Sequence, residues 1–178
     1  YESTANETGA GLGRNLDGCR ISFDLGGSDR KCAAVVDGKV VHSEEVEWDP
    51  YFQADPQYHL DGIRDSLQRA AAKLPRVDAI GGSAAGVYIN NQVRVASLFR
   101  GVPEDVFAER VTDMFIELGR EWGVPLEVVN DGEVTALAAS MSQDVDAVLG
   151  VAMGTSEAAG YVNAAGNITN WLNELAFV

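Results

Sequence analysis

The fold of this chain is decided by residues 21–31, Ile21-Ser22-Phe23-Asp24-Leu25-Gly26-Gly27-Ser28-Asp29-Arg30-Lys31. An apolar strand reaches an acid and turns at two glycines followed by a small hydroxyl residue. Without Cβ atoms, Gly26 and Gly27 can adopt positive φ angles and approach a ligand closely, and N–H groups in such a turn can hold an anion. Asp24 at the strand end suits a hydrated Mg²⁺, which takes few carboxylates. The alternative is a tight turn that binds nothing and that Asp24 only caps.

Two further apolar segments follow this turn. Residues 32–36 form the first, and Asp37-Gly38 leads into the second. An Asp-Gly pair between two β-rich segments predicts a hairpin. We therefore expect three meandering strands near 20–25, 31–37 and 39–48.

Helical and extended segments alternate through the rest of the chain. Apolar residues at helical spacing predict one helix from the Asp55-Pro56 start to Pro75 and a second, continuous helix over 103–123. A third helix follows residue 131, and its apolar face is expected to consist of Val134, Leu137, Ala138 and Met141. Strands are expected at 77–80, 125–129 and 147–152.

Small residues follow several of these strands. Gly81-Gly82 is read as a turn that ends the strand at 77–80, and Asn90-Asn91 as the turn of a hairpin. In mixed sheets with helices on their faces, ligands bind at the carboxyl ends of strands. Asp24, Gly81-Gly82, Asp131 and Gly154-Thr155 all fall at such ends, so we expect them to line one cleft.

Composition limits the classes of function. The 178 residues are 46% hydrophobic and carry a net charge of −14, which argues against nucleic-acid or anionic-membrane binding as the main role. Backbone donors can still hold a phosphate in an acidic protein. Cys19 and Cys32 have no metal-binding spacing and fit a reduced, cytoplasmic setting. The sequence has no apolar run of membrane-spanning length, so no membrane span is expected.

Three ordered motifs resemble the sugar kinase, actin and heat-shock-chaperone ATPase superfamily, and within it the ROK family of repressors and sugar kinases. Residues 24–28 look like the first phosphate loop of that family, with Ser28 where threonine is usual. Residues 130–138 are similar to its catalytic Asn-Asp stretch, and 150–156 to its second phosphate loop. Residues 173–177 are a weaker match to its sugar-binding Gly-Glu-Ile-Gly-His motif.

The resemblance implies an α/β fold, namely a ribonuclease-H-like (actin-like ATPase) domain with a mixed sheet, helices on both faces, and the first strands of a second similar domain. We expect a flexible leader over residues 1–19, the N-terminal domain over 20–146 and a truncated second domain over 147–178. The chain begins and ends like a fragment, so we expect the isolated chain to show little or no turnover.

The resemblance also implies roles for individual residues in phosphoryl transfer from Mg-ATP to a sugar hydroxyl. Asp131 would be the catalytic base, while Asn130 and Glu174 would bind the sugar. Asp24 would hold Mg²⁺ through water. The residues that would cradle the ATP phosphates are Gly26, Gly27, Ser28, Gly154 and Thr155. For Asp131, the competing interpretation is a helix cap.

Some positions depart from the family pattern. Asp29 puts a negative charge directly after the first phosphate loop, and Glu157 does so after the second. Phe177 stands where the family has histidine, and the family's cysteine-rich zinc motif is absent from this sequence. Of these, Glu157 and Phe177 favour an alternative, a catalytically degenerate ROK-like sugar sensor, whereas the zinc motif is expected beyond Val178 and favours neither reading. A third reading is another branch of the superfamily with a non-sugar acceptor.

Expectations about partners follow from the resemblance as well. The partner would be a small-molecule sugar, with no nucleic acid bound by this chain, because no helix-turn-helix pattern precedes residue 20. A homodimer is the usual assembly in the family, although nothing in the sequence shows an interface.

Overall fold

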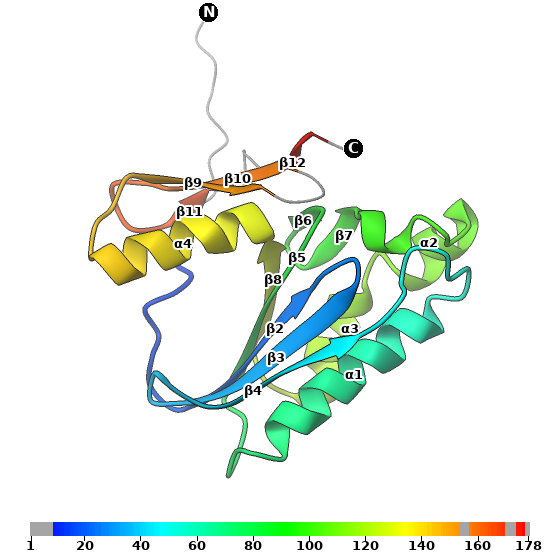
Figure 1. Ribbon diagram of the computed structural model, residues 1–178, viewed down its shortest axis with the longest axis horizontal. Helices are drawn as coiled ribbons and strands as arrows, with labels where there is room; N and C mark the ends of the chain where they lie inside the picture. Colours follow the sequence, from blue (N-terminus) through cyan, green and yellow to red (C-terminus); the bar gives the residue numbers. More distant parts are fainter. Residues whose placement is uncertain (1–8, 154–156, 170–173, 177–178) are drawn as a thin grey trace, which may run out of the picture. The chain divides into compact units, whose positions relative to one another are not determined.

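The computed structural model describes residues 9–153, 157–169 and 174–176, and the chain divides into two compact units (Figure 1). One unit is Leu16–Val129, and the other combines Tyr1–Asn15 with Asn130–Val178. Each unit has its own sheet and its own hydrophobic core. The mixed α/β class expected from the sequence is confirmed.

The Leu16–Val129 unit is built on a mixed five-stranded sheet. The sheet has the order β4-β3-β2-β5-β8, with antiparallel β2–β3 and β3–β4 pairs and a parallel β2–β5 pair. Its strands are β2 (Cys19–Leu25), β3 (Asp29–Val36), β4 (Lys39–Glu47), β5 (Ala79–Ala84) and β8 (Leu126–Asn130). The three meandering strands predicted at the start of the chain are therefore present.

Two predicted hairpins form as expected. Asp37 and Gly38 have φ angles of 46° and 76°, and this pair of positive φ angles is the signature of a type I′ turn. Asn90 (φ 52°) and Asn91 (φ 62°) make the same kind of turn between the short strands β6 (Val87–Ile89) and β7 (Gln92–Val95). Asparagine and aspartate tolerate positive φ better than other non-glycine residues, so these turns are locally encoded.

Alternation along β2 determines which face of the sheet is covered. Ile21, Phe23 and Leu25 are buried, whereas Ser22 between them is exposed. Phe23 stacks on Phe115 with ring centroids 6.0 Å apart, and α1 (Gln57–Ala71) adds buried residues to the same core. Each large side chain buried here contributes about 1.5–3 kcal/mol to stability.

Two expectations about local structure are wrong. The helix expected over 103–123 is two helices, α2 (Glu104–Arg110) and α3 (Met114–Trp122). They separate because the Thr112 carbonyl accepts a hydrogen bond from the Val93 N–H of β7, at 2.9 Å, instead of continuing the helix. The Gly81-Gly82 turn is also absent, because β5 runs through both glycines.

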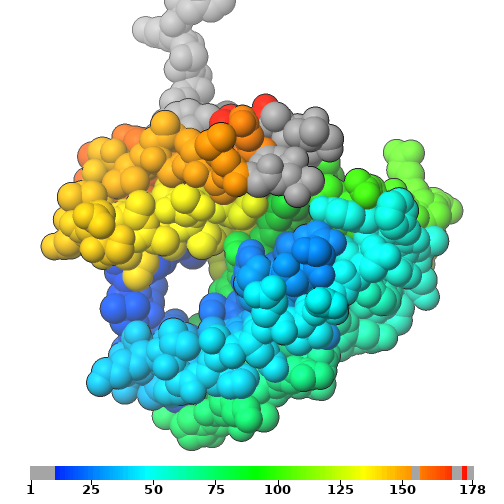
Figure 2. Space-filling view, in the orientation of Figure 1, coloured from blue at the N-terminus to red at the C-terminus, as the bar shows by residue number. Residues whose placement is uncertain are grey.

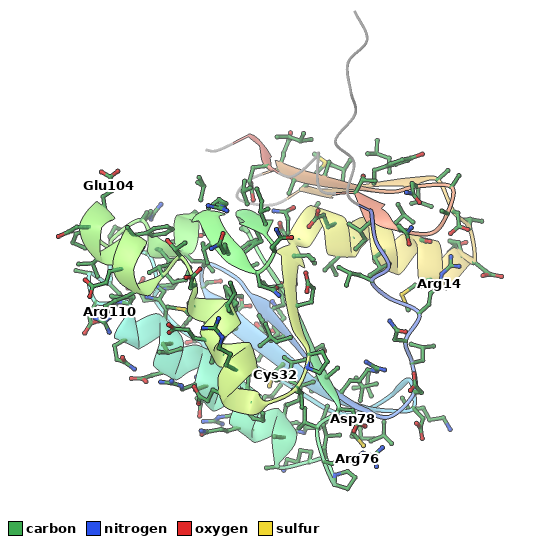
Figure 3. The ribbon with its side chains drawn as sticks, turned by 180° about the vertical axis from the view of Figure 1, so that it is seen from behind. Arg14, Cys32, Arg76, Asp78, Glu104 and Arg110 are labelled. Atoms are coloured by element: carbon green, nitrogen blue, oxygen red, sulfur yellow. The ribbon has the colours of Figure 1, made fainter. Side chains whose placement is uncertain are left out.

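Helix α1 begins close to the predicted residue and ends early. The Asp55 carboxylate accepts the Gln57 N–H at 3.0 Å, and it also pairs with Arg110 of α2, labelled in Figure 3, at 2.9 Å. The helix ends at Ala71, ahead of Pro75. Arg76 and Asp78, also labelled, form an ion pair of 2.7 Å before β5.

Strand β8 is at one edge of the sheet, and the side chain of Asn91 forms hydrogen bonds with its backbone. The Asn91 amide donates to the Leu126 carbonyl at 2.9 Å and accepts from the Val128 N–H at 2.8 Å. At the other end, β4 lies on the surface of the unit (Figure 2, cyan). It carries three glutamates, Glu44, Glu45 and Glu47.

The second unit consists of one helix packed on one sheet. In the sheet, β10 (Glu157–Val162) pairs antiparallel with β9 (Val148–Met153), β11 (Ile168–Thr169) and β12 (Glu174–Ala176). Residues of the expected leader take part, since β1 (Gly9–Ala10) pairs with β11. Arg14, labelled in Figure 3, forms a 2.7 Å ion pair with Asp146.

Helix α4 (Asp131–Gln143) buries a different face from the one predicted. Ala138 is exposed and Val134 and Met141 are only partly buried, although Leu137 packs against the core of this unit. The buried residues are Gly132, Glu133, Ala136 and Ser140. Glycines explain the change: a methyl group on Gly150 of β9 would lie 2.3 Å from the Ala136 nitrogen, and one on Gly160 of β10 would lie 2.3 Å from Glu133 Cα. The small-residue face therefore packs at backbone contact with β9 and β10.

Among the described residues, none of the helices combines the length and apolar character needed to cross a membrane.

Candidate functional site

The turn between β2 and β3 holds the first predicted phosphate loop. Its Gly26 N–H donates to the Asp29 carbonyl at 2.9 Å, and Trp48 fixes it through an Nε1–H bond to the Gly26 carbonyl at 2.7 Å. Neither Gly26 nor Gly27 has a positive φ angle. Gly27 is required by space instead, because a methyl group there would lie 1.9 Å from the Tyr51 hydroxyl oxygen.

The Asp29 carboxylate binds two neighbouring polar side chains of this turn. Its carboxylate accepts the Ser28 hydroxyl at 3.0 Å and pairs with Lys31 Nζ at 2.5 Å. The Lys31 hydrogen bond lowers the pKa of Asp29, and the same bond raises the pKa of Lys31. Both groups are therefore charged at neutral pH. A phosphate at this loop would meet the Asp29 carboxylate, and Ser28 would have to rotate away from it to donate.

Asp24 lies at the end of β2 with one oxygen fixed. In the parallel register Asp24 faces Ser83 of β5, and in the antiparallel register it faces Lys31 of β3. The Ser83 hydroxyl, 7% exposed, donates to Asp24 Oδ1 at 2.6 Å. A single oriented carboxylate fits a Mg²⁺ that keeps most of its water ligands.

Within the ranges that the structure describes, no three His, Cys, Asp or Glu side chains converge on one point. Mg²⁺ at Asp24 would therefore depend on water and phosphate oxygens for its other ligands.

The second group of predicted residues lies at the start of α4. Asn130 is fully buried and caps the helix, since its Oδ1 accepts the Gly132 N–H at 2.8 Å. The Glu133 carboxylate accepts the Asn130 N–H at 3.0 Å and completes a capping box. The cap considered for Asp131 thus belongs to Asn130, and Asp131 is the first residue of the helix.

The Asn130 side chain joins two predicted substrate-binding residues. Its Nδ2 donates to Glu174 Oε1 of β12 at 2.9 Å, across 44 positions of sequence. Asp131 follows directly and is partly exposed, at a helix end where the backbone dipole favours negative charge. The Asn130 amide and the Glu174 carboxylate are thus bonded to each other directly beside the first residue of the helix, Asp131, and amides and carboxylates can bind hydroxyls and accept a proton.

Gly154, Thr155 and Phe177 lie outside the described residues. Glu157, which follows the second phosphate loop, is the exposed first residue of β10.

The sequence alone did not indicate several residues that contact the glycine turn, Asp24 or the start of α4. Ser83 lies beside Asp24 because of the register of β2 with β5, and no local sequence pattern predicts that register. Trp48 and Tyr51 reach the glycine turn from a loop more than twenty positions later. Glu133 had a signal, because an Asn followed three residues later by Glu is a capping pattern.

Comparison with solved structures identifies proteins of similar fold. No protein-family description and no curated protein matches the sequence. An inorganic polyphosphate/ATP-glucomannokinase from Arthrobacter sp. strain KM is similar in structure, with a TM-score of 0.68 and 21% identity over 86% of this chain and 62% of that one.

Two other solved structures extend the comparison. A ROK family transcriptional regulator, a homologue of the E. coli MLC protein, has a TM-score of 0.68 and 24% identity over 92% of this chain and 42% of that one. A ROK family protein from Streptococcus pneumoniae TIGR4, in complex with sucrose, has a TM-score of 0.62 and 14% identity over 84% and 47% of the two chains.

These likenesses show the fold: the chain folds like the matching part of these sugar-kinase and ROK structures. The chain spans about two-fifths to three-fifths of the length of these solved proteins.

Proposed function

We propose that this chain is part of a ROK-like protein that binds a sugar and transfers the γ-phosphoryl group of Mg-ATP to one of its hydroxyls. The observation that carries the proposal is the hydrogen bond between Asn130 and Glu174 beside Asp131. It joins the two residues to which the resemblance gives sugar-binding roles, and the next residue in the chain is the one to which it gives the catalytic role. Sugar kinases and a sucrose complex among the structural neighbours support the same reading.

Asp131 is the proposed base. A carboxylate beside the attacking hydroxyl accepts its proton as the bond to phosphorus forms. Asn130 and Glu174 would orient the sugar through neighbouring hydroxyls, and their mutual hydrogen bond holds both side chains in place before the sugar arrives.

Asp24 and the glycine turn have the proposed role of binding Mg-ATP. When bound, Mg²⁺ neutralises the phosphate charge that develops during transfer. Asp24 would hold its water shell, oriented by Ser83. Gly27, Ser28, Gly154 and Thr155 would donate to phosphate oxygens, while Gly26 N–H keeps the shape of the turn through Asp29.

A second candidate function is a sugar sensor without catalysis. Asp29 favours it, because its ionised carboxylate binds the Ser28 hydroxyl that phosphate would need. The regulator among the structural neighbours supports this candidate too. Sugar binding is common to both candidates, so turnover separates them.

The test uses the protein expressed from its natural reading frame, with Mg-ATP and a panel of hexoses, amino sugars and polyols. We expect sugar-dependent ADP release that falls by about 10²- to 10⁴-fold in Asp131→Asn, the range typical of a general base. Asp144→Asn is the matched control, because Asp144 is exposed in a left-handed conformation at the other end of α4, which asparagine tolerates.

Three outcomes decide between the candidates. Release that survives in Asp131→Asn would remove Asp131 from the mechanism. Sugar affinity without ADP release would support the sensor. Absence of both sugar binding and release would contradict either candidate.

A further inference from the structure

Arg100 lies on two aromatic rings near the predicted phosphate loop. Its guanidinium carbon is 3.9 Å from the centroid of the Tyr51 ring and 5.1 Å from that of Phe52. Phe52 is 76% exposed. Such contacts attract the cation to the ring faces, and a guanidinium carries five N–H donor groups in one plane. Those groups match the oxygens of a phosphate.

Tyr51 connects this arginine to the glycine turn. The Tyr51 hydroxyl sits where a side chain on Gly27 would be, 1.9 Å from the position of its Cβ. The ring therefore carries a hydroxyl at the loop and a cation on its face. Both groups belong to the Leu16–Val129 unit.

The segments that carry the two residues are fixed to each other. Buried His59 bonds through Nε2 to the Pro50 carbonyl at 3.0 Å and to the Leu98 carbonyl at 2.9 Å. Next to Arg100, a methyl group on Gly101 would lie 2.9 Å from the Gln53 carbonyl oxygen. The arginine is consequently held by close backbone packing and is not carried on a loose loop.

The charges around Arg100 point to a ligand from outside the protein. The chain has 27 acidic and 13 Lys and Arg residues, and most of its arginines form ion pairs or side-chain hydrogen bonds. Arg100 forms neither within the described ranges, although it is exposed. A pre-positioned cation without an acidic partner, in a protein with excess acid, suits an anionic ligand.

We propose that Arg100 and the Tyr51 hydroxyl bind a phosphoryl group at the Gly26-Gly27 turn. The ligand class is a terminal phosphoryl group of a polyphosphate or phosphate ester. The inference names residues for the phosphate in the proposed function and rests on that function only for the identity of the phosphate donor. It also supplies a positive charge at a loop where Asp29 contributes a negative one.

The test is calorimetric titration of the unaltered chain with inorganic pyrophosphate, without sugar or metal. We expect Arg100→Gln to weaken binding by roughly tenfold, as for the loss of a charge-assisted hydrogen bond. Tyr51→Phe keeps the ring under Arg100 and should weaken binding by about threefold. Arg120→Gln is the matched control, because Arg120 is exposed on α3 and makes no ion pair in the described residues.

Equal losses in Arg100→Gln and Arg120→Gln would show a general charge effect and overturn the proposal. So would failure of the unaltered chain to bind pyrophosphate. The result is independent of sugar-dependent ADP release. Pyrophosphate binding that requires Arg100 can occur without turnover, and turnover with an unchanged KM for ATP in Arg100→Gln would contradict this inference alone.

Discussion

Gly81 and Gly82 are neighbours in β5, yet they have opposite surroundings. A methyl group on Gly82 would lie 2.0 Å from the Phe23 ring, whereas one on Gly81 would meet no atom within 4 Å. Alternation along a strand explains the difference, because successive residues point to opposite faces. One glycine makes room for the Phe23–Phe115 stack, and the other does not.

Alanine at these two positions should therefore have different effects. Gly82→Ala forces Phe23 to move and should lower the unfolding free energy by about 1–3 kcal/mol. Gly81→Ala should be neutral or stabilise by up to about 1 kcal/mol, since alanine has less backbone freedom to lose. Chemical denaturation of both variants measures this. Equal effects would contradict the packing described for β5.

His59 is a buried imidazole among aromatic rings. Its Nε2–H donates to two carbonyls, while Nδ1 has no hydrogen-bond partner in the described residues. Burial lowers the pKa of His59, opposed more weakly by the two carbonyl bonds and by Asp55. The imidazole is therefore neutral in the folded protein at neutral pH.

This lowered pKa predicts acid sensitivity. The stabilising effect of neutral His59 is fully present above pH ~6.5, the pKa of histidine in the unfolded chain, and is lost as the pH falls toward the lower pKa of the folded state. It is lost because the unfolded chain then binds a proton that the folded chain does not. One such group gives at most about 1.4 kcal/mol per pH unit.

Urea unfolding between about pH 7.5 and 5.5, where a histidine of the unfolded chain titrates, measures the slope. We expect His59→Gln to flatten it, whatever its effect on stability at pH 7. A slope that persists in His59→Gln would assign the acid sensitivity to other groups.

At the scale of elements, α4 depends on glycine more than on apolar side chains. Gly132 of the helix would clash with Ala159 if it carried a methyl group, and Gly150 and Gly160 of the strands would clash with the helix backbone. The helix and the strands consequently touch along their backbones. This close packing also brings the capped start of α4, with Asn130 and Asp131, against the sheet that carries Glu174.

Gly150→Ala should disturb this packing. Its added methyl group would meet the Ala136 backbone at 2.3–2.5 Å, which side-chain rotation cannot relieve. We expect a loss of about 2–4 kcal/mol, at the upper end for point substitutions. Gly11→Ala is the control, because its nearest neighbour would be Asn167 Oδ1 at an ordinary 3.6 Å. Thermal unfolding with equal midpoints for the two variants would refute the backbone contact.

At the scale of the whole molecule, features encoded by neighbouring residues could be predicted from the sequence. The Asp37-Gly38 and Asn90-Asn91 turns are of this kind, because their residues favour the required φ angles. The break between α2 and α3 was not predictable, since it depends on a bond from distant Val93. The buried face of α4 was missed because its packing depends on glycines of later strands.

In the candidate site too, some residues could be predicted from local sequence and others could not. Asp24 and the glycine turn could be found from one short stretch, and Asn130 and Asp131 from another. Glu174 joins Asn130 across 44 positions, and only the family resemblance linked them. The bond of Ser83 to Asp24 and the Tyr51–Arg100 stack arise from strand register and loop packing, which leave no local pattern in the sequence.

The amide of Asn91 has a consequence for how copies of this protein behave together. A strand at the end of a sheet offers unpaired N–H and carbonyl groups to any other strand, and this is a common route to aggregation. The Asn91 side chain takes up one donor and one acceptor of β8, as a further strand would, but it is too short to continue the ladder. We therefore expect this one residue of a hairpin turn to disfavour β-sheet pairing between copies of the protein through β8.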